Sequence, residues 1–204
     1  MTNLEQRVQD GDQQALAELF QIERARLRKI VDTRLDVRLQ GRVDPSDVLQ
    51  ETFVDLTKKL AGYRERCRTK PMSLFVWMRL VAVERVLICH RAHLDAGARA
   101  VQREVVRLNA NSATSMFLAE QFLAQFASAE HRLLKKEMQQ VLLKTLDEME
   151  PLDHEVITMR YFEELTNGEI AESLGISKNA ASSRFVRAMT RLRQELDTIP
   201  GFTD

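Results

Sequence analysis

The stretch that decides the fold is residues 166–192, TNGEIAESLGISKNAASSRFVRAMTRL, which predicts two short helices joined by a tight turn. Thr166 opens a capping box, the S/T-x-x-E pattern that satisfies exposed backbone donors at a helix start. Gly175 supplies the left-handed position that ends the first helix, and Ser177 caps the second. The sequence therefore predicts a helix-turn-helix whose second helix spans about residues 178–193.

The second of these helices carries charge of one sign. Five basic residues and no acidic residue lie between residues 178 and 193. Such a helix suits the major groove of DNA, because its first residues reach base edges while Arg and Lys along it neutralise phosphates. A solvated basic helix in an ordinary bundle is the alternative, since a basic patch alone is only an electrostatic footprint. The capped helix, the glycine turn and the basic helix together favour DNA binding.

The composition favours an all-α fold. The 204 residues include only 7 Gly and 4 Pro, and β-branched residues nowhere alternate over more than a few positions. This length permits one large domain or two small ones. The formal net charge is zero but segregated: residues 58–107 hold 12 basic and 4 acidic side chains, and residues 137–172 hold 2 basic and 10 acidic. Two parts of the chain therefore offer opposite fields to partners.

Other classes of function find little support in the sequence. The N-terminus, MTNLEQRVQDGD, has no apolar signal segment, and no run approaches a membrane span. Two cysteines are too few for a disulfide framework, so we expect a cytoplasmic protein without membrane insertion. Cys89, His90 and His93 offer too few ligands for a metal. The four histidines have no partnered nucleophile, and we expect no catalytic residue and no cofactor.

A second capped helix is predicted to begin at Asp44. Asp44 stands at the N-cap and Pro45 at the first helical position, where its missing N–H costs nothing. Asp47, Gln50 and Glu51 follow at i, i+3 and i+4, so they share a polar face beside an apolar stripe. The alternative is an ordinary amphipathic helix whose acids only complement its N-terminus.

This pattern carries a specific resemblance. Asp-x-x-Gln-Glu, about thirty residues before an aromatic-rich basic helix, resembles region 2.2 of bacterial sigma factors. In that family, this face docks on the clamp-helix coiled coil of the largest RNA polymerase subunit. The resemblance implies that Asp47, Gln50 and Glu51 bind core RNA polymerase.

The next segment extends the resemblance. Residues 74–82, LFVWMRLVA, are similar to the F-x-x-W-L-x-x-I-A pattern of region 2.3, and Arg91 matches the Arg that closes region 2.4. These regions melt and hold the −10 promoter element in the family. Glu84 and Ile88 depart from the pattern, because they stand where Asn and Asp are usual.

Physical chemistry is compatible with that role. Four basic residues are expected in a short loop that ends at Pro71, and cationic grooves beside aromatic rings hold single-stranded DNA. The helical spacing of Trp77 to Leu80 and Val81 favours a core position over a stacking platform. The −10 contacts implied are Arg64, Arg66, Arg68, Lys70, Trp77 and Arg91.

Residues 146–177 resemble region 4 of the same family, with His154 in place of its usual Arg. In that region the second helix of the helix-turn-helix reads the −35 element. Ser182 occupies a place that is often basic in relatives. The −35 contacts implied by position are Lys178, Asn179, Ser182, Ser183, Arg184 and Arg187.

The two resemblances together match the extracytoplasmic-function type of sigma factor, which has two small helical domains joined by a linker. The expected domains are residues 1–105 for region 2, residues 106–130 for a linker with a short apolar helix, and residues 131–204 for region 4. Within the linker, residues 116–126 carry an apolar stripe that must be buried somewhere. We hypothesise that this stripe packs between the two domains in the free protein and rearranges on polymerase.

The resemblance implies a sigma factor that binds core RNA polymerase and directs transcription initiation at −10 and −35 elements. Its expected partners are core RNA polymerase, promoter DNA and, as a further candidate, an anti-sigma factor. The alternative is a helix-turn-helix transcriptional regulator with an N-terminal sensing or dimerisation domain. That alternative explains the basic helix, but it leaves the Asp47, Gln50 and Glu51 face as a coincidence.

Overall fold

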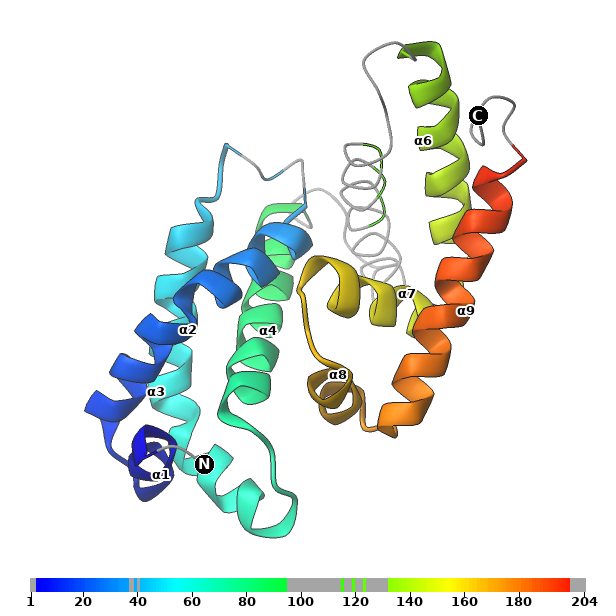
Figure 1. The fold of residues 1–204 in the computed structure, drawn as a ribbon. Helices are drawn as coiled ribbons and strands as arrows, with labels where there is room; N and C mark the ends of the chain where they lie inside the picture. Colours follow the sequence, from blue (N-terminus) through cyan, green and yellow to red (C-terminus); the bar gives the residue numbers. More distant parts are fainter. Residues whose placement is uncertain are drawn as a thin grey trace. The chain divides into compact units, whose positions relative to one another are not determined.

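The computed structural model describes residues 3–36, 39, 41–94, 115, 119, 123 and 132–198. Over these residues the chain is helical and contains no strand, which confirms the predicted all-α class. The chain divides into two compact units, residues 1–99 and residues 100–204 (Figure 1).

The N-terminal unit is built from α1 (Asn3–Asp10), α2 (Gln13–Arg34), α3 (Pro45–Thr69) and α4 (Leu74–Leu94). Helices α2, α3 and α4 pack against one another, and α1 packs on α2. The sequence periodicity did not show the break between α1 and α2. Gly11 makes this break with φ of 101°, and the Asp12 side chain then accepts hydrogen bonds from the N–H groups of Gln14 and Ala15.

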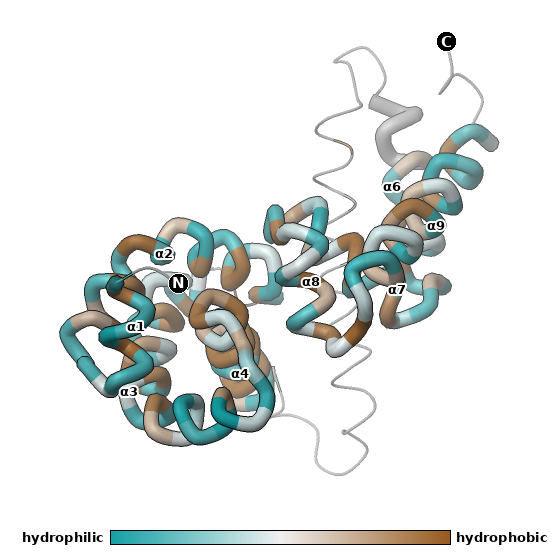
Figure 2. The backbone as a smooth tube through the Cα atoms, turned by 60° about the horizontal axis from the view of Figure 1, so that its bottom comes forward, coloured by the Kyte–Doolittle hydropathy of each residue, from teal (hydrophilic) through white to brown (hydrophobic). Residues whose placement is uncertain are grey.

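Helix α4 forms the centre of the N-terminal unit. Residues 74–79 are buried in succession, on every side of the helix, and α4 is predominantly brown in Figure 2. A helix that is apolar all round is stable in water only when neighbours cover it. Helices α2 and α3 supply that cover, so the buried faces of these two helices are fixed by α4.

The C-terminal unit contains α6 (Arg132–Asp147), α7 (Pro151–Ile157), the π-helix η3 (Thr158–Phe162), α8 (Asn167–Leu174) and α9 (Lys178–Leu196). Helix α9 packs on α6, α7 and α8. The predicted helix-turn-helix is confirmed at each end. Both hydrogen bonds of the Thr166 capping box are present, Gly175 has φ of 67°, and the Ser177 side chain accepts from the N–H of Ala180.

Three residues of the expected linker are described, and they pack in the C-terminal unit. Ser115, Ala119 and Leu123 are helical, lie four residues apart and are 0–1% exposed. Ala119 and Leu123 belong to one apolar core with residues of α6, α7, η3 and α9. Ser115 Oγ lies 3.1 Å from Nε2 of His154, which is itself buried. The rest of the apolar stripe, Leu118, Phe122 and Phe126, lies outside the described residues.

Leu123→Ala tests whether the predicted linker is part of this core. Removing a fully buried Leu side chain should lower the free energy of unfolding by about 2–5 kcal/mol, through lost burial and a residual cavity. Urea unfolding of the full chain should show an earlier transition by circular dichroism. The fluorescence of Trp77, the single tryptophan, reports the N-terminal unit and should keep its midpoint.

Val186→Ala is the matched control, because Val186 is 59% exposed in the same unit. Equal, small effects of the two substitutions would show that Leu123 does not contribute to the core in solution.

Candidate nucleic-acid interface

Some of the predicted −35 residues of α9 are exposed to solvent, whereas Arg184 is held by ion pairs with acidic side chains. Four of the predicted −35 contacts are exposed, namely Lys178, Asn179, Ser183 and Arg187. The opposite side of α9 is buried through Ala181, Ala188 and Leu192. Burial of these apolar side chains therefore fixes which side of α9 a duplex can approach.

One exposed residue of α9, Val186, was not among the contacts predicted from the sequence. Val186 is a large apolar residue, yet 59% of it is exposed, between Ser183 and Arg187 in the chain. Apolar side chains in the major groove contact the methyl group of thymine. An apolar residue on the polar side of an amphipathic helix is the sequence signal that could have identified it. We call Lys178, Asn179, Ser183, Val186 and Arg187 the reading face.

Arg184 is held by two carboxylates of the same unit. Its Nη1 donates to Oε2 of Glu150 at 2.9 Å and to Oδ1 of Asp153 at 2.6 Å, and its side chain is 22% exposed. The hydrogen bonds that Arg184 donates to Asp153 and, second, to Glu150 raise the pKa of Arg184 above its ordinary value. Arg187 Nη2 lies 3.9 Å from the same Asp153 oxygen but is 64% exposed. Two arginines of one helix therefore differ sharply in their availability.

The predicted polymerase contacts lie together on the surface. Asp47, Gln50 and Glu51 are all exposed on the first turns of α3, which begins at Asp44 as predicted. The Asp44 side chain accepts from the N–H of Ser46, and this hydrogen bond lowers the pKa of Asp44 below its ordinary value. We call the three exposed residues the acidic-amide face.

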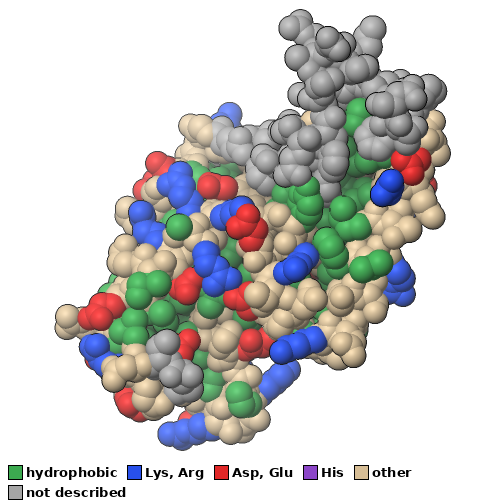
Figure 3. Space-filling view, viewed as in Figure 1, with side chains coloured by type: hydrophobic (Ala, Val, Ile, Leu, Met, Phe, Trp, Pro, Cys, Tyr) green, Lys and Arg blue, Asp and Glu red, His purple; other side chains and the backbone are tan. Residues whose placement is uncertain are grey.

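Helix α4 supports the acidic-amide face through Arg85. Arg85 Nη1 lies 3.2 Å from Oε2 of Glu51, and Arg85 Nε donates to Asp55 at 2.9 Å. The hydrogen bond to Asp55 raises the pKa of Arg85. Glu51 remains 58% exposed, so it can still contact a partner. Figure 3 shows acidic and basic side chains next to one another on the surface of the N-terminal unit.

The prediction of a basic loop before Pro71 is wrong for three of its four cations. Arg64, Arg66 and Arg68 lie in α3, which continues to Thr69, and only Lys70 lies beyond the helix, at its C-cap. Helix α3 continues because its last turns still bury apolar side chains, including Leu60 and Tyr63. The residue before a proline is driven out of helical geometry, which explains the end at Lys70.

These cations also point to different places. Arg64 Nε donates to the carbonyl oxygen of Gln9 at 2.5 Å, so it holds α1. Arg68 pairs with Glu65 on the exposed surface, and Arg91 Nε donates to the carbonyl of Leu87 in its own helix. Of the predicted −10 residues, the structure brings together Arg66 and Trp77.

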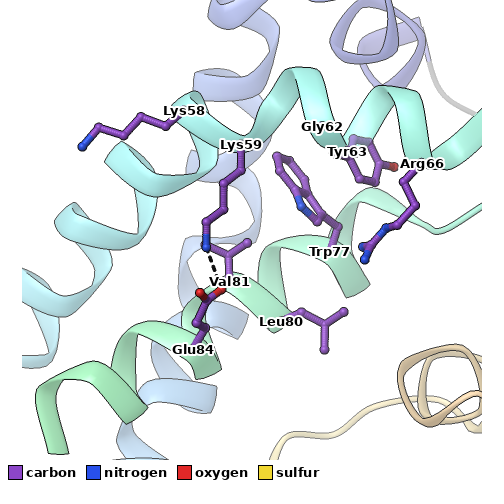
Figure 4. A pocket seen from close by; sticks show the side chains of 9 residues that line it. All are labelled: Lys58, Lys59, Gly62, Tyr63, Arg66, Trp77, Leu80, Val81 and Glu84. Carbon is purple, nitrogen blue, oxygen red and sulfur yellow. Dashed lines mark hydrogen bonds and ion pairs between the residues drawn. The ribbon is translucent and has the colours of Figure 1, made fainter. Parts of the chain in front are cut away.

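Arg66 and Trp77 line a pocket of about 400 Å³ between α3 and α4 (Figure 4). Trp77 is 4% exposed and stacks on Tyr63, with ring centroids 4.3 Å apart. The prediction that Trp77 is a core residue is confirmed. Lys59 Nζ donates to Oε2 of Glu84 at 2.6 Å across the pocket. The lining residues are Lys58, Lys59, Gly62, Tyr63, Arg66, Trp77, Leu80, Val81 and Glu84.

The pocket combines three kinds of group that contact nucleotides. Its lysines and its arginine can neutralise phosphates, and its apolar and aromatic wall can contact a base. Glu84 adds a carboxylate, which can accept a hydrogen bond from the amino group of cytosine. In the sequence, Glu84 was recognisable only as a departure from the family pattern. The missing information was that Lys59, 25 residues earlier, lies opposite it.

The described residues contain neither a membrane-spanning helix nor a cluster suited to a metal ion. Across the described helices, none is long and apolar enough to cross a membrane. Within the same part of the chain, no cluster of three or more His, Cys, Asp or Glu is arranged to hold a metal ion. His90 is a buried structural residue, because its Nε2 accepts a hydrogen bond from the N–H of Asp36.

Comparison with known proteins decides what the helix-turn-helix belongs to. Residues 139–192 match the family described as Sigma-70, region 4, a range that includes α7, η3, α8 and most of α9. The chain also resembles a solved structure of CnrH in complex with the cytosolic domain of CnrY. The TM-score is 0.52 at 19% identity, and the match covers 95% of each chain. No curated protein matches the chain in sequence.

Residues 139–192 therefore belong to the family of sigma-70 region 4. The solved structure shares the fold over both units, and at this identity the likeness shows the fold alone. The reading face lies on the last helix of the region 4 match, and the acidic-amide face and the α3–α4 pocket lie in the N-terminal unit.

Proposed function

We propose that the chain is a sigma factor of the extracytoplasmic-function type, which divides promoter recognition among three surfaces. The acidic-amide face binds core RNA polymerase, the α3–α4 pocket holds the −10 element, and the reading face of α9 contacts the −35 element. The observation that carries the proposal is the region 4 match across the helix-turn-helix. The protein acts as a specificity subunit in the cytoplasm and has no catalytic activity of its own.

The acidic-amide face suits a protein partner. Its three residues are exposed near the N-terminus of α3. One of them, Glu51, also accepts a hydrogen bond from Arg85 of α4. A rim of carboxylates steers a basic surface into register and contributes specificity more than raw affinity. The resemblance to region 2.2 supports the clamp helices of core polymerase as that partner.

The α3–α4 pocket suits a nucleotide of an opened −10 element. Bases in a duplex are inaccessible to a pocket, so a protein must take the base out of the stack or bind single-stranded DNA. Arg66 and Lys58 supply cations at the pocket, and Trp77 with Tyr63 supplies its rigid wall. Trp77 therefore contributes mainly as wall and support, because its own ring is buried.

A protein partner is also proposed. CnrH, which shares the fold, is bound to the cytosolic domain of CnrY in its solved structure. We propose that an anti-sigma protein binds this sigma factor and blocks its use by polymerase.

Transcription in vitro tests the function as a whole. The full chain would be combined with core RNA polymerase and a library of random promoter sequences, and the transcripts would be sequenced. A shared pair of upstream motifs at fixed spacing is the expected result. Failure to form a holoenzyme, together with specific binding of palindromic DNA by the chain alone, would instead establish the helix-turn-helix regulator.

Asp47→Lys tests the acidic-amide face. Reversing an exposed charge at a steered interface should weaken core-polymerase binding by about tenfold or more, because like charges then oppose one another. Binding would be measured by fluorescence anisotropy of labelled sigma factor titrated with core polymerase.

Glu65→Lys is the matched control for this measurement, since Glu65 is 71% exposed on the same helix and pairs only locally with Arg68. Equal losses for the two variants would show a general charge effect and remove Asp47 from the interface.

Arg187→Ala tests the reading face. Arg187 is 64% exposed, and losing one phosphate contact should reduce the slope of log K against log salt by about 0.9. The holoenzyme would be titrated against a promoter duplex at several salt concentrations. Arg193→Ala is the control, because Arg193 is also exposed but lies in the last turn of α9. An unchanged slope for Arg187→Ala would remove Arg187 from the phosphate contacts.

A further inference from the structure

Asp153 is not among the predicted DNA contacts, but it forms ion pairs with Arg184 and Arg187 of α9. Asp153 lies in the first turn of α7, and its carboxylate is 15% exposed. Its Oδ1 accepts from Arg184 Nη1 at 2.6 Å and lies 3.9 Å from Arg187 Nη2. One half-buried oxygen thus faces two arginines of the recognition helix.

Asp153 and Glu150 hold Arg184 unequally. Glu150 also accepts from Arg184, at 2.9 Å, but its side chain is 58% exposed. An exposed pair is weakened by water and salt, whereas a half-buried charge-assisted hydrogen bond is stronger. Asp153 is therefore the inner partner that determines where the Arg184 guanidinium lies.

A DNA phosphate offers an arginine the same kind of partner as a carboxylate does. Both anions accept two parallel hydrogen bonds from a guanidinium. While Asp153 holds Arg184, the transfer of Arg184 to a phosphate has to break an existing charge-assisted pair. Phosphate contacts strengthen binding to every sequence alike, whereas base contacts discriminate. Withholding one cation therefore lowers binding to every DNA sequence without removing a base contact.

We propose that Asp153 limits the sequence-independent affinity of this sigma factor for DNA, because it keeps Arg184 off the DNA phosphates. The proposal rests on the proposed −35 role of α9. Under it, Arg184 positions α9 against α7, and the discrimination among sequences comes from the exposed reading face. Arg187, which is only 3.9 Å from Asp153 and largely exposed, remains available to the duplex.

The test uses the full-length chain assembled with core RNA polymerase. Holoenzymes with wild-type sigma factor and with Asp153→Asn are titrated, in a salt series, against a promoter duplex and against a duplex with a scrambled −35 element. Releasing Arg184 should tighten binding to both duplexes by about threefold and steepen both salt slopes by about 0.9, as one added phosphate contact would. The ratio of the two affinities should stay the same, because a phosphate contact does not discriminate between sequences.

Two further variants identify the cause. Glu148→Gln removes one negative charge from the same segment, at a residue whose side chain is 56% exposed and pairs with Lys144, so it should leave both affinities unchanged. Adding Arg184→Gln to Asp153→Asn should remove the gain on both duplexes, because no cation is then released. Circular dichroism confirms that each variant is folded.

The outcomes are distinguishable. Weaker binding of both duplexes by Asp153→Asn at an unchanged salt slope would show that the ion pair only supports the helix, and would overturn the proposal. An equal gain for Glu148→Gln would overturn it in favour of a general charge effect. If the wild-type holoenzyme itself shows no preference for the promoter duplex, the proposed −35 function fails, independently of Asp153.

Discussion

Burial of the inner side of α9 is the constraint on which the reading face depends. Ala188, Leu192 and Leu196 enter one apolar core with residues of α6, α7 and η3. A one-residue rotation of the helix would turn it by about 100° and expose this stripe. The apolar core therefore fixes the orientation of the reading face. Ala119 and Leu123 extend the same core, so the expected linker contributes to the orientation of the recognition helix.

A parallel constraint operates in the N-terminal unit. Helix α4 is buried on all sides at its start, so α3 has to turn its apolar stripe towards α4 and its acidic-amide face outward. Arg85 then joins α4 to Glu51 and Asp55 of α3 at the edge of that face. The stacked pair of Tyr63 and Trp77 joins the same two helices further along. Thus the acidic-amide face and the α3–α4 pocket share one helix pair.

The sequence predicted the features that depend on neighbouring residues. The caps at Asp44, Thr166 and Ser177 were predictable because a cap is a hydrogen bond across two or three positions. The extension of α3 past Arg64 was not, because it depends on Tyr63 stacking against a ring on another helix. The pairing of Arg184 with Asp153 joins residues 31 positions apart and leaves no periodic signal. Family resemblance assigned Arg184 to DNA by position, without regard to its acidic neighbours.

The segregation of charge along the chain has a different meaning once the contacts are known. The acidic residues 137–172 and the basic α9 belong to one unit, and two of those acids lie against Arg184. Part of the positive charge of α9 is therefore neutralised within the protein before any DNA approaches. In salt of about 0.1 M, electrostatic interactions are screened over about 10 Å. The electrostatic potential around α9 therefore depends more on such neighbouring carboxylates than on the total charge of the helix. The affinity of this helix for DNA therefore depends on which of its cations are held by nearby carboxylates. Arg184 is held closely by Asp153, whereas Arg187, one turn further along the same helix, lies 3.9 Å from that carboxylate.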